Sequence, residues 1–482
     1  MADGINGRVK SSFGWKFFER IGVQVTNLLV SILLARMLTP KEYDPISLIL
    51  IFVNLATVFV QGGLNTALIQ KKEVEKRDFS STLYVSLSVA AVLYLIIFLS
   101  SPAMARFYAL PEFSPMLRVT ALILFPGAFN SVQLAHATRS FRFRDIFVSS
   151  ILAVLLAATT GIVMAYNGFG AWALVAQQVV YHTSVCIIQW IVSRWLPFGA
   201  FSWKNVRALA PFGIKVLVNN FIIALFLDIR GLLIGKVYPD GSLSNFNQGN
   251  RFPQAVMESV NGTIQTVLLP VYAKEQDSRQ QVKEMLRMTM RLSTFLVMPL
   301  MAGMAVVARP MILALLTEKW LGAVFFLQMF CISYILMMIQ LPPVQAYRAL
   351  GDSTTPLVLE CIKKALELIA LLITIWISIE AVALSVVICG ATSVLVGIIA
   401  NHIKLKYSFG QQLRDILPAL LLSLGMAVVV KLVSLISMPL VLSLVVQILA
   451  GAVTYVALAF LFRVEAVKIL LGALRRRKSK EA

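Results

Sequence analysis

Residues 212–235 read "FGIKVLVNNFIIALFLDIRGLLIG", an apolar run of 24 residues that carries an acid and an arginine near its end. A helix of this length rises about 36 Å, enough to cross the roughly 30 Å hydrocarbon core of a bilayer. Asp228 and Arg230 are two residues apart, so on a helix they point to roughly opposite sides and do not pair with each other. The run predicts a membrane-spanning helix whose charges need a polar or hydrated surrounding.

The composition of the whole chain places this run in a membrane protein. Of the 482 residues, 59% are hydrophobic and only 14% are charged, and the mean hydropathy is +0.82. An ordinary soluble domain is closer to half apolar and about a quarter charged. Alternating apolar stretches of about ten residues, typical of membrane β-barrels, are not found. The composition predicts an all-α polytopic membrane protein.

Fourteen apolar segments are long enough to span a membrane. They fall at about 17–37, 44–63, 80–101, 114–135, 146–166, 171–192, 212–235, 247–270, 289–308, 322–341, 357–378, 380–400, 416–437 and 439–462. Prolines lie near the ends of several of these segments and predict helix ends, among them at Pro40, at Pro211 and at the pair Pro342 and Pro343. We therefore expect about fourteen transmembrane helices.

Lysine and arginine are distributed unevenly between alternate loops. If the N-terminus is cytoplasmic, the cytoplasmic segments hold 32 of these residues and the outer segments hold 8, while Arg20, Arg230 and Arg251 lie within or at the edge of a span. Basic residues favour the cytoplasmic side of a membrane, so we expect both termini there. Orientation and attraction to anionic lipid account for the net charge of +20, and we expect no nucleic-acid partner.

Signatures of enzymes and of bound metals are missing from the sequence. The four cysteines lie singly in apolar segments and the three histidines stand alone, which favours packing over disulfides or metal ligation. The chain has no HExxH, GxSxG or P-loop pattern. We expect a transporter with no metal and no cofactor.

Two parts of the chain resemble each other at an offset of about 200 residues. "FGWK" (13–16) matches "FGIK" (212–215), and "GGLNTALIQ" (62–70) matches "GTIQTVLLP" (262–270). The repeat predicts a six-helix N-terminal lobe over 1–195 and a six-helix C-terminal lobe over 196–405. Residues 406–482 then supply two additional helices and a basic cytoplasmic tail. Repeat halves commonly enclose a site near the midplane of the membrane and expose it to alternate sides.

Charges within the spans have more than one interpretation. An arginine or aspartate at the centre of a bilayer costs about 2.5–3.5 kcal/mol on insertion scales, so such residues usually face a polar interior. Asp228 and Arg20 also lie where their side chains can reach a membrane surface, and Arg251 and Glu258 can form a structural ion pair. We interpret the group Glu360, Lys363, Lys364 and Glu367 as pairs at a cytoplasmic helix end, with Glu360–Lys364 and Lys363–Glu367 partners.

Several blocks of the sequence resemble one known family. They are "LLARMLTPKEYD" (33–44), "FVQGGLNTALIQKKE" (59–73), "FYALPEFSPMLRVTALILFPGAFNSVQ" (107–133), "GFGAWALVAQQ" (168–178), "LLIGKVY" (232–238), "NGTIQTVLLPVYAKEQD" (261–277), "LLTEKWLGAVFFLQMFCISY" (315–334) and "QAYRALGD" (345–352). The chain resembles the Wzx-type polysaccharide flippases of the polysaccharide-transport branch, in the multidrug/oligosaccharidyl-lipid/polysaccharide superfamily. The resemblance implies a V-shaped fold of two six-helix lobes.

The same resemblance implies a function and a location. Members of the family that the chain resembles move undecaprenyl-diphosphate-linked oligosaccharide repeat units from the inner to the outer leaflet of the bacterial cytoplasmic membrane. The exported units supply capsule, exopolysaccharide or O-antigen assembly, so other polysaccharide assembly proteins are possible partners. A cleft with water and a few arginines would replace the hydration of the diphosphate, while the polyprenyl tail stays in lipid.

Candidate substrate-binding residues follow from that cargo. We expect Arg20 and Arg230, and then Arg251, to bind the diphosphate. The amides of Asn27, Asn219 and Gln248 can form hydrogen bonds with sugar hydroxyls. If transport is coupled to H⁺ or Na⁺, Asp228 or Glu258 can titrate. The chain departs from the family at Tyr43-Asp44-Pro45, where relatives often have Phe-Gly, and at Gln248, where they commonly have arginine.

Three other functions compete with this prediction. A cation-coupled multidrug exporter of the same superfamily would share the fold but would need acids more than arginines in its site. A lipid II flippase would also have fourteen helices and a cationic site. A membrane-bound polymerase or glycosyltransferase is disfavoured, because the loops are short and carry no carboxylate motif.

Overall fold

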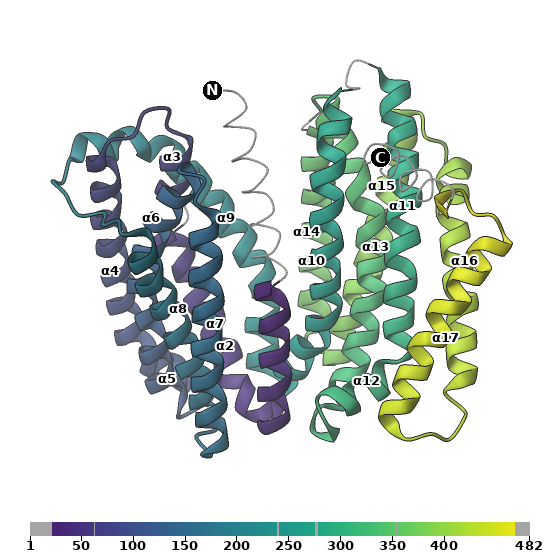
Figure 1. Ribbon diagram of the computed structural model, residues 1–482, viewed down its shortest axis with the longest axis horizontal. Coiled ribbons are helices and arrows are strands. Elements are labelled where there is room, and N and C mark those ends of the chain that lie inside the picture. The colour runs from purple at the N-terminus through teal and green to yellow at the C-terminus, as the bar shows by residue number, and fades with distance from the viewer. Residues whose placement is uncertain (1–21, 62, 239–240, 275–277, 353, 468–482) are drawn as a thin grey trace, which may run out of the picture. The chain divides into compact units, whose positions relative to one another are not determined.

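The computed structural model describes residues 22–467 apart from 62, 239–240, 275–277 and 353, and it omits the side chains of 261–274. The part described is helical and contains no β-strand. By their contacts the residues divide into two compact units, Met1–Ser244 and Asn245–Ala482, coloured from purple to teal and from teal to yellow in Figure 1. The all-α polytopic fold is thus confirmed.

Unit 1, residues 1–244, begins with a helix over Gly22–Met37. It continues with α2 (Pro40–Gln61), α3 (Leu64–Gln70), α4 (Lys76–Tyr108), α5 (Phe113–Thr120), the 3₁₀ turn η1 (Ala121–Ile123), α6 (Leu124–Arg139), α7 (Phe143–Tyr166), α8 (Trp172–Ser193) and α9 (Trp203–Val237).

Unit 2, residues 245–482, takes up the chain within α10 (Ser242–Lys274). The helices that follow are α11 (Arg279–Val306), α12 (Ala308–Leu315), η2 (Glu318–Trp320), α13 (Ala323–Ala349), α14 (Thr354–Thr374), α15 (Ile379–Leu405), α16 (Phe409–Val433) and α17 (Leu440–Leu461).

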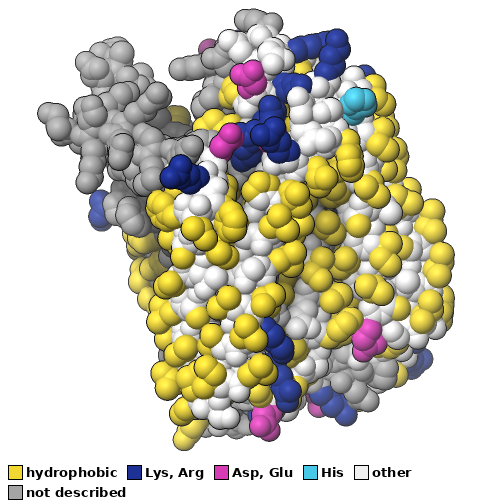
Figure 2. All heavy atoms as spheres, turned by 90° about the vertical axis from the view of Figure 1, so that its right-hand side faces the viewer, with side chains coloured by type: hydrophobic (Ala, Val, Ile, Leu, Met, Phe, Trp, Pro, Cys, Tyr) yellow, Lys and Arg dark blue, Asp and Glu magenta, His cyan; other side chains and the backbone are white. Residues whose placement is uncertain are grey.

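Within the described residues, each of the fourteen predicted spans falls mainly on a helix. Ten helical segments of the described chain are long and apolar enough to cross a membrane, counting α5, η1 and α6 as one segment. The other four predicted spans coincide with the shorter helix Gly22–Met37 and with α8, α10 and α14, which carry more polar side chains. The chain is a multi-pass membrane protein. In Figure 2, hydrophobic side chains cover the middle of one face and basic side chains gather toward its ends.

Two predicted helix ends are wrong. Helix α9 begins at Trp203, so Pro211 lies inside it rather than before its start. Helix α13 likewise continues through Pro342 and Pro343 to Ala349. Proline is tolerated inside membrane helices because neighbouring helices and local adjustments satisfy the freed carbonyl groups. The start of α9 is set instead by Ser202, whose hydroxyl accepts a hydrogen bond from the backbone N–H of Asn205.

Polar contacts as well as apolar packing hold the end of α3 and the loop between α3 and α4 in unit 1. Arg139 at the end of α6 donates to the carbonyl oxygens of Leu68, Ile69 and Lys71 at 2.9, 2.9 and 2.5 Å. Beside them, the buried carboxylate of Asp78 accepts from Lys71 Nζ at 2.8 Å. Hydrogen bonds from a charged donor are stronger than those from a neutral one, so Arg139 helps to fix the end of α3 and the loop that follows it.

Helix α9 belongs to unit 1, because it packs against α2, α3 and α4. The predicted lobe boundary at 195/196 therefore precedes the contact boundary at 244/245. The first is a boundary of a sequence repeat and the second is one of packing, and the repeat boundary stays a prediction. In unit 2, α16 packs against both α11 and α17, so the two additional helices share a core with the rest of that unit around Met426 and Tyr455.

The predicted ion pairs on α14 are partly correct. Lys364 Nζ lies 3.8 Å from Glu360 Oε1, as expected, and 3.0 Å from Glu367 Oε2. Lys364, not Lys363, is therefore the partner of Glu367, because positions three apart on a helix are as close as positions four apart.

Candidate functional site

Helix α9 carries three of the candidate residues and is held tightly against α2. A Cβ atom added at Gly231 would lie 2.6 Å from Ile51 Cδ1, and one added at Gly235 would lie 3.0 Å from Leu48 Cγ. These distances show that the glycine pair allows the close helix contact that GxxxG spacing predicts. The packing fixes the rotation of α9, and with it the directions of its polar side chains.

The candidate residues of unit 1 differ in exposure. Asn219 on α9 and Asn27 on the first helix are exposed, whereas Asp228 and Arg230 are half-buried. Arg20 lies outside the described residues, so its predicted contact with the diphosphate stays a prediction. Asn219 and the two half-buried charges share one helix, α9, over about three turns.

The candidate residues of unit 2 all lie on α10. Gln248 is buried, with 4% of its surface exposed, Arg251 is half-buried and Glu258 is exposed. Next to Gln248, a Cβ atom at Gly249 would lie 2.6 Å from Phe326 Cβ on α13. This crossing of α10 and α13 turns Gln248 into the interior of unit 2, and among the described residues its amide nitrogen finds no hydrogen-bond partner.

A line of hydrogen bonds runs along α10 and ends at one of these candidates. Tyr334 on α13 donates from its hydroxyl to Asn250 Oδ1 at 3.0 Å. Asn250 Nδ2 in turn donates to Gln254 Oε1 at 3.4 Å, and Gln254 Nε2 donates to Glu258 Oε1 at 2.9 Å. We call these four residues the α10 polar line.

The α10 polar line has the chemistry of a sugar-binding surface. Residues 250, 254 and 258 repeat every four positions, so they lie on one face of the helix. Gln254 and Glu258 are exposed. Amide and hydroxyl groups both donate to and accept from sugar hydroxyls, and a carboxylate accepts from them. The half-buried Arg251 adds a positive charge on the same helix. Sequence reasoning found only the last member of the line, although the four-residue spacing was a signal for the other two.

Comparison with known proteins identifies the family. Residues 33–325 match the family model described as "Polysaccharide biosynthesis protein". The succinoglycan biosynthesis transport protein ExoT of Rhizobium meliloti is 25% identical over 65% of this chain and 63% of its own length. The lipopolysaccharide biosynthesis protein WzxC of Escherichia coli is 20% identical over 66% of this chain and 65% of its own length. The aligned part of the chain thus spans a little under two thirds of these relatives.

Solved structures agree on the fold. The lipid II flippase MurJ in an inward closed conformation aligns with a TM-score of 0.74 at 17% identity, covering 94% of this chain and 98% of MurJ. An inward-facing multidrug resistance MATE transporter aligns with a TM-score of 0.61 at 12% identity, covering 81% of this chain and 98% of that one. The matched segment, 33–325, is more than half of the sequence, and the chain belongs to the family described as polysaccharide biosynthesis proteins.

Proposed function

We propose that the protein is a flippase for undecaprenyl-diphosphate-linked oligosaccharide repeat units and moves them from the inner to the outer leaflet by alternating access. Family membership supports this proposal, because relatives carry names from succinoglycan transport and lipopolysaccharide biosynthesis. The observation that carries it within the molecule is the α10 polar line, which presents amides and a carboxylate suited to sugar hydroxyls. Arg251 beside it, Arg230 on α9 and Arg20 are the proposed diphosphate ligands.

The proposed location is the bacterial cytoplasmic membrane, with both termini in the cytoplasm. The lipid-linked repeat unit carries a sugar and a diphosphate, and neither crosses hydrocarbon without replacement of its hydration. Arginine is suited to this task because its planar guanidinium binds phosphate oxygens in pairs. Export then supplies an assembly system for capsule, exopolysaccharide or O-antigen, whose polymerase and related proteins are the proposed partners.

The proposal is tested in a strain that lacks the gene and is complemented with variants. Arg230→Ala should abolish polymer export, and Gln254→Leu should lower it about tenfold, because this change removes two hydrogen bonds of the line. Gln280→Leu is the matched control, since Gln280 is an exposed amide on α11 outside the line. The quantities measured are surface polymer, lipid-linked oligosaccharide trapped on the inner leaflet, and the amount of protein in the membrane.

The competing functions give different results in the same strain. Normal polymer export without the gene, together with lost tolerance to cationic drugs, would identify a multidrug exporter. Accumulated peptidoglycan precursors would identify a lipid II flippase. Normal export from both Arg230→Ala and Gln254→Leu would remove these two residues from the substrate site.

Ion coupling belongs to the proposal as well. Glu258 at the end of the polar line and Asp228 on α9 are the carboxyl groups proposed to carry H⁺ or to bind Na⁺. Glu258→Gln keeps the hydrogen-bond acceptor for Gln254 and removes the charge. Transport by this variant in vesicles should lose its dependence on an imposed ion gradient, whereas unchanged dependence would exclude Glu258 as the coupling group.

A further inference from the structure

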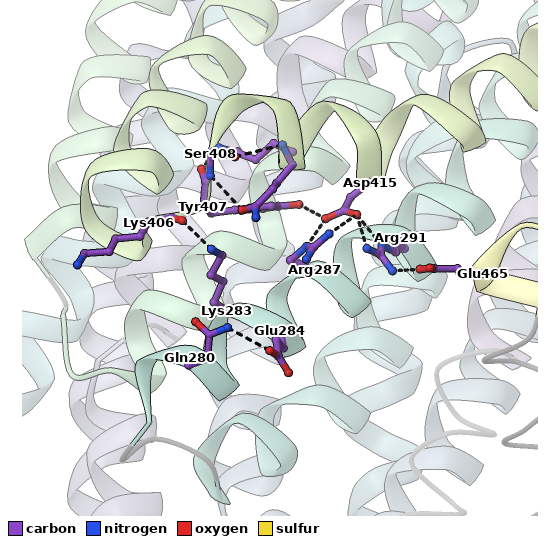
Figure 3. A network of polar contacts seen from close by, with 12 residues as sticks. Gln280, Lys283, Glu284, Arg287, Arg291, Lys406, Tyr407, Ser408, Asp415 and Glu465 are labelled. Carbon is purple, nitrogen blue, oxygen red and sulfur yellow. Dashed lines mark hydrogen bonds and ion pairs between the residues drawn. The ribbon is translucent and has the colours of Figure 1, made fainter.

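A charged network joins three helices of unit 2 away from the α10 polar line. Arg287 Nε on α11 donates to Asp415 Oδ2 on α16 at 2.7 Å, and Arg291 Nε, one turn further along α11, donates to Asp415 Oδ1 at 2.6 Å. Tyr407 Oη donates to the same carboxylate at 2.7 Å, and Arg291 also pairs with Glu465, which follows α17. Figure 3 shows the two arginines converging on Asp415.

The carboxylate of Asp415 accepts four hydrogen bonds from the two arginines and Tyr407, and its side chain is only 1% exposed. Two arginines one turn apart would repel each other without this shared carboxylate. Burial, followed by the hydrogen bond to Asp415, raises the pKa of Tyr407 in the turn between α15 and α16, so the phenol remains a donor. The network thus holds Arg287 and Arg291 in fixed positions.

A cavity of about 890 Å³ opens beside this network. Its polar part is formed by the network and by Arg414 on α16, and its apolar part includes Leu417 and Leu421 on α16 and Leu458 on α17. A volume of this size is at the upper end of the range of roughly 300–1,000 Å³ for small-molecule sites. Charged and apolar walls in one cavity suit an amphipathic molecule.

The charges that line the cavity do not cancel. Three arginines (Arg287, Arg291 and Arg414) face two carboxylates (Asp415 and Glu465). Arg414 is exposed, and within the described ranges it forms no ion pair or hydrogen bond. One positive charge is left over. This excess matches a phosphodiester, which carries a single negative charge, better than a diphosphate, which carries more.

The position of the cavity along the helices agrees with a lipid ligand. Arg287 lies two turns into α11, Arg414 lies in the second turn of α16, and Glu465 follows the end of α17. All three ends are cytoplasmic in the predicted orientation. The inner leaflet is the one in which anionic lipids attract basic residues near a membrane surface. From this level the leucines of α16 and α17 lead toward the apolar middle of the helices.

We propose that this cavity binds one anionic phospholipid, with its phosphate on Arg291 and Arg414 and an acyl chain along Leu417, Leu421 and Leu458. Arginine can hold a phosphate oxygen pair through parallel N–H groups, and its five donors leave some free after the contacts to Asp415 and Glu465. The bound lipid would neutralise the excess charge and fill the space between α11, α16 and α17. This site does not depend on the proposed transport function.

The test is lipid binding by the full-length protein, purified in detergent and delipidated. Native mass spectrometry measures adducts of phosphatidylglycerol, phosphatidylcholine and undecaprenyl phosphate. Thermal shift measures the stabilisation of the protein by the same lipids and by inorganic phosphate. We expect phosphatidylglycerol to bind at least about tenfold more tightly than phosphatidylcholine, as expected for one added charge-assisted contact. Arg414→Gln should remove that preference, and Arg279→Gln, an exposed arginine near the start of α11 and outside the cavity, should leave it unchanged.

Each other outcome overturns the proposal. Both phospholipids contain a phosphodiester, so equal binding of the two excludes selection for an anionic headgroup. Equal losses from Arg414→Gln and Arg279→Gln indicate attraction by surface charge alone. Inorganic phosphate that competes as well as the lipid excludes the acyl contact. Preferential binding of undecaprenyl phosphate assigns the cavity to the transport substrate. Leu421→Ser provides a second variant, because this half-exposed leucine can change without disturbing the arginines, and it should weaken lipid binding without affecting inorganic phosphate.

Discussion

Asp44 on α2 binds the start of α10 through Ser244, 200 residues later in the chain. Its Oδ1 accepts from the Ser244 backbone N–H at 2.9 Å and from the Ser244 hydroxyl at 2.6 Å, and its Oδ2 accepts from the Gly241 N–H at 2.5 Å. A helix start leaves backbone N–H groups without partners inside the helix and favours negative charge. Asp44 therefore has a structural role at the start of α10.

Replacement of Asp44 by alanine should destabilise unit 1 at this joint. The change leaves the N–H groups of Gly241 and Ser244 without their acceptor, and loss of a helix-capping acceptor costs about 1–2 kcal/mol. We expect a lower midpoint of thermal unfolding in detergent, measured by size exclusion after heating. Glu73→Ala, which removes an exposed acid of the α3–α4 loop, should leave the midpoint unchanged. An unchanged midpoint in Asp44→Ala would contradict the capping role.

Asp415→Ala should be the more damaging change, because it leaves Arg287 and Arg291 facing each other without a shared carboxylate. Removing one partner from a buried ion pair typically costs about 3 kcal/mol, and both arginine side chains are about three-quarters buried. The loss is measured by thermal unfolding. Glu360→Ala removes a carboxylate that is 57% exposed from its pair with Lys364, and an exposed pair contributes less than about 1 kcal/mol. Similar losses in the two variants would contradict the network.

Gly63→Ala should separate α3 from α9. An added Cβ atom would meet the backbone of Gly213, and backbone atoms cannot move aside as side chains can. We expect a clear loss of thermal stability or of protein in the membrane. Gly397→Ala on α15 is the matched control, because nothing lies within 4 Å of its added Cβ. Since alanine favours helix over glycine by about 1 kcal/mol, this control should be neutral or stabilising, and equal losses would refute the contact.

The predicted orientation can be tested with single cysteines in a variant that lacks the four natural ones. Lys72→Cys in the α3–α4 loop should react with a membrane-impermeant maleimide only after the cells are opened. Asn167→Cys between α7 and α8 should react in intact cells, because it lies in a segment predicted to be outside. Both positions are exposed. Labelling of Lys72→Cys in intact cells would show that the orientation is the reverse of the predicted one.

The class of the protein and the positions of its spans could be read from the sequence because hydropathy is local. About twenty apolar residues in a row must cross a membrane or be buried whatever their neighbours do, and within the described residues each predicted span falls mainly on a helix. Proline was less informative. The cost of Pro211 inside α9 depends on which neighbours satisfy the freed carbonyl, and those neighbours are brought there by the fold.

The candidate site was predicted in part for the same reason. Sequence indicated that α9 and α10 carry polar and charged side chains at membrane depth, because such residues are conspicuous in apolar runs. It did not indicate that Tyr334 reaches Asn250, or that Arg287 and Arg291 share Asp415. Those partners are separated by 84, 128 and 124 residues.

The sequence by itself thus determined an all-helical membrane chain and its family, since composition, span length and motif blocks need no knowledge of contacts. The tertiary structure decided which polar groups are in contact, at which glycines two helices approach closely, and where a charged cavity forms. The physical reason is that helix formation in a membrane follows from local hydropathy, whereas hydrogen bonds and ion pairs depend on the packing of helices that are distant in the chain.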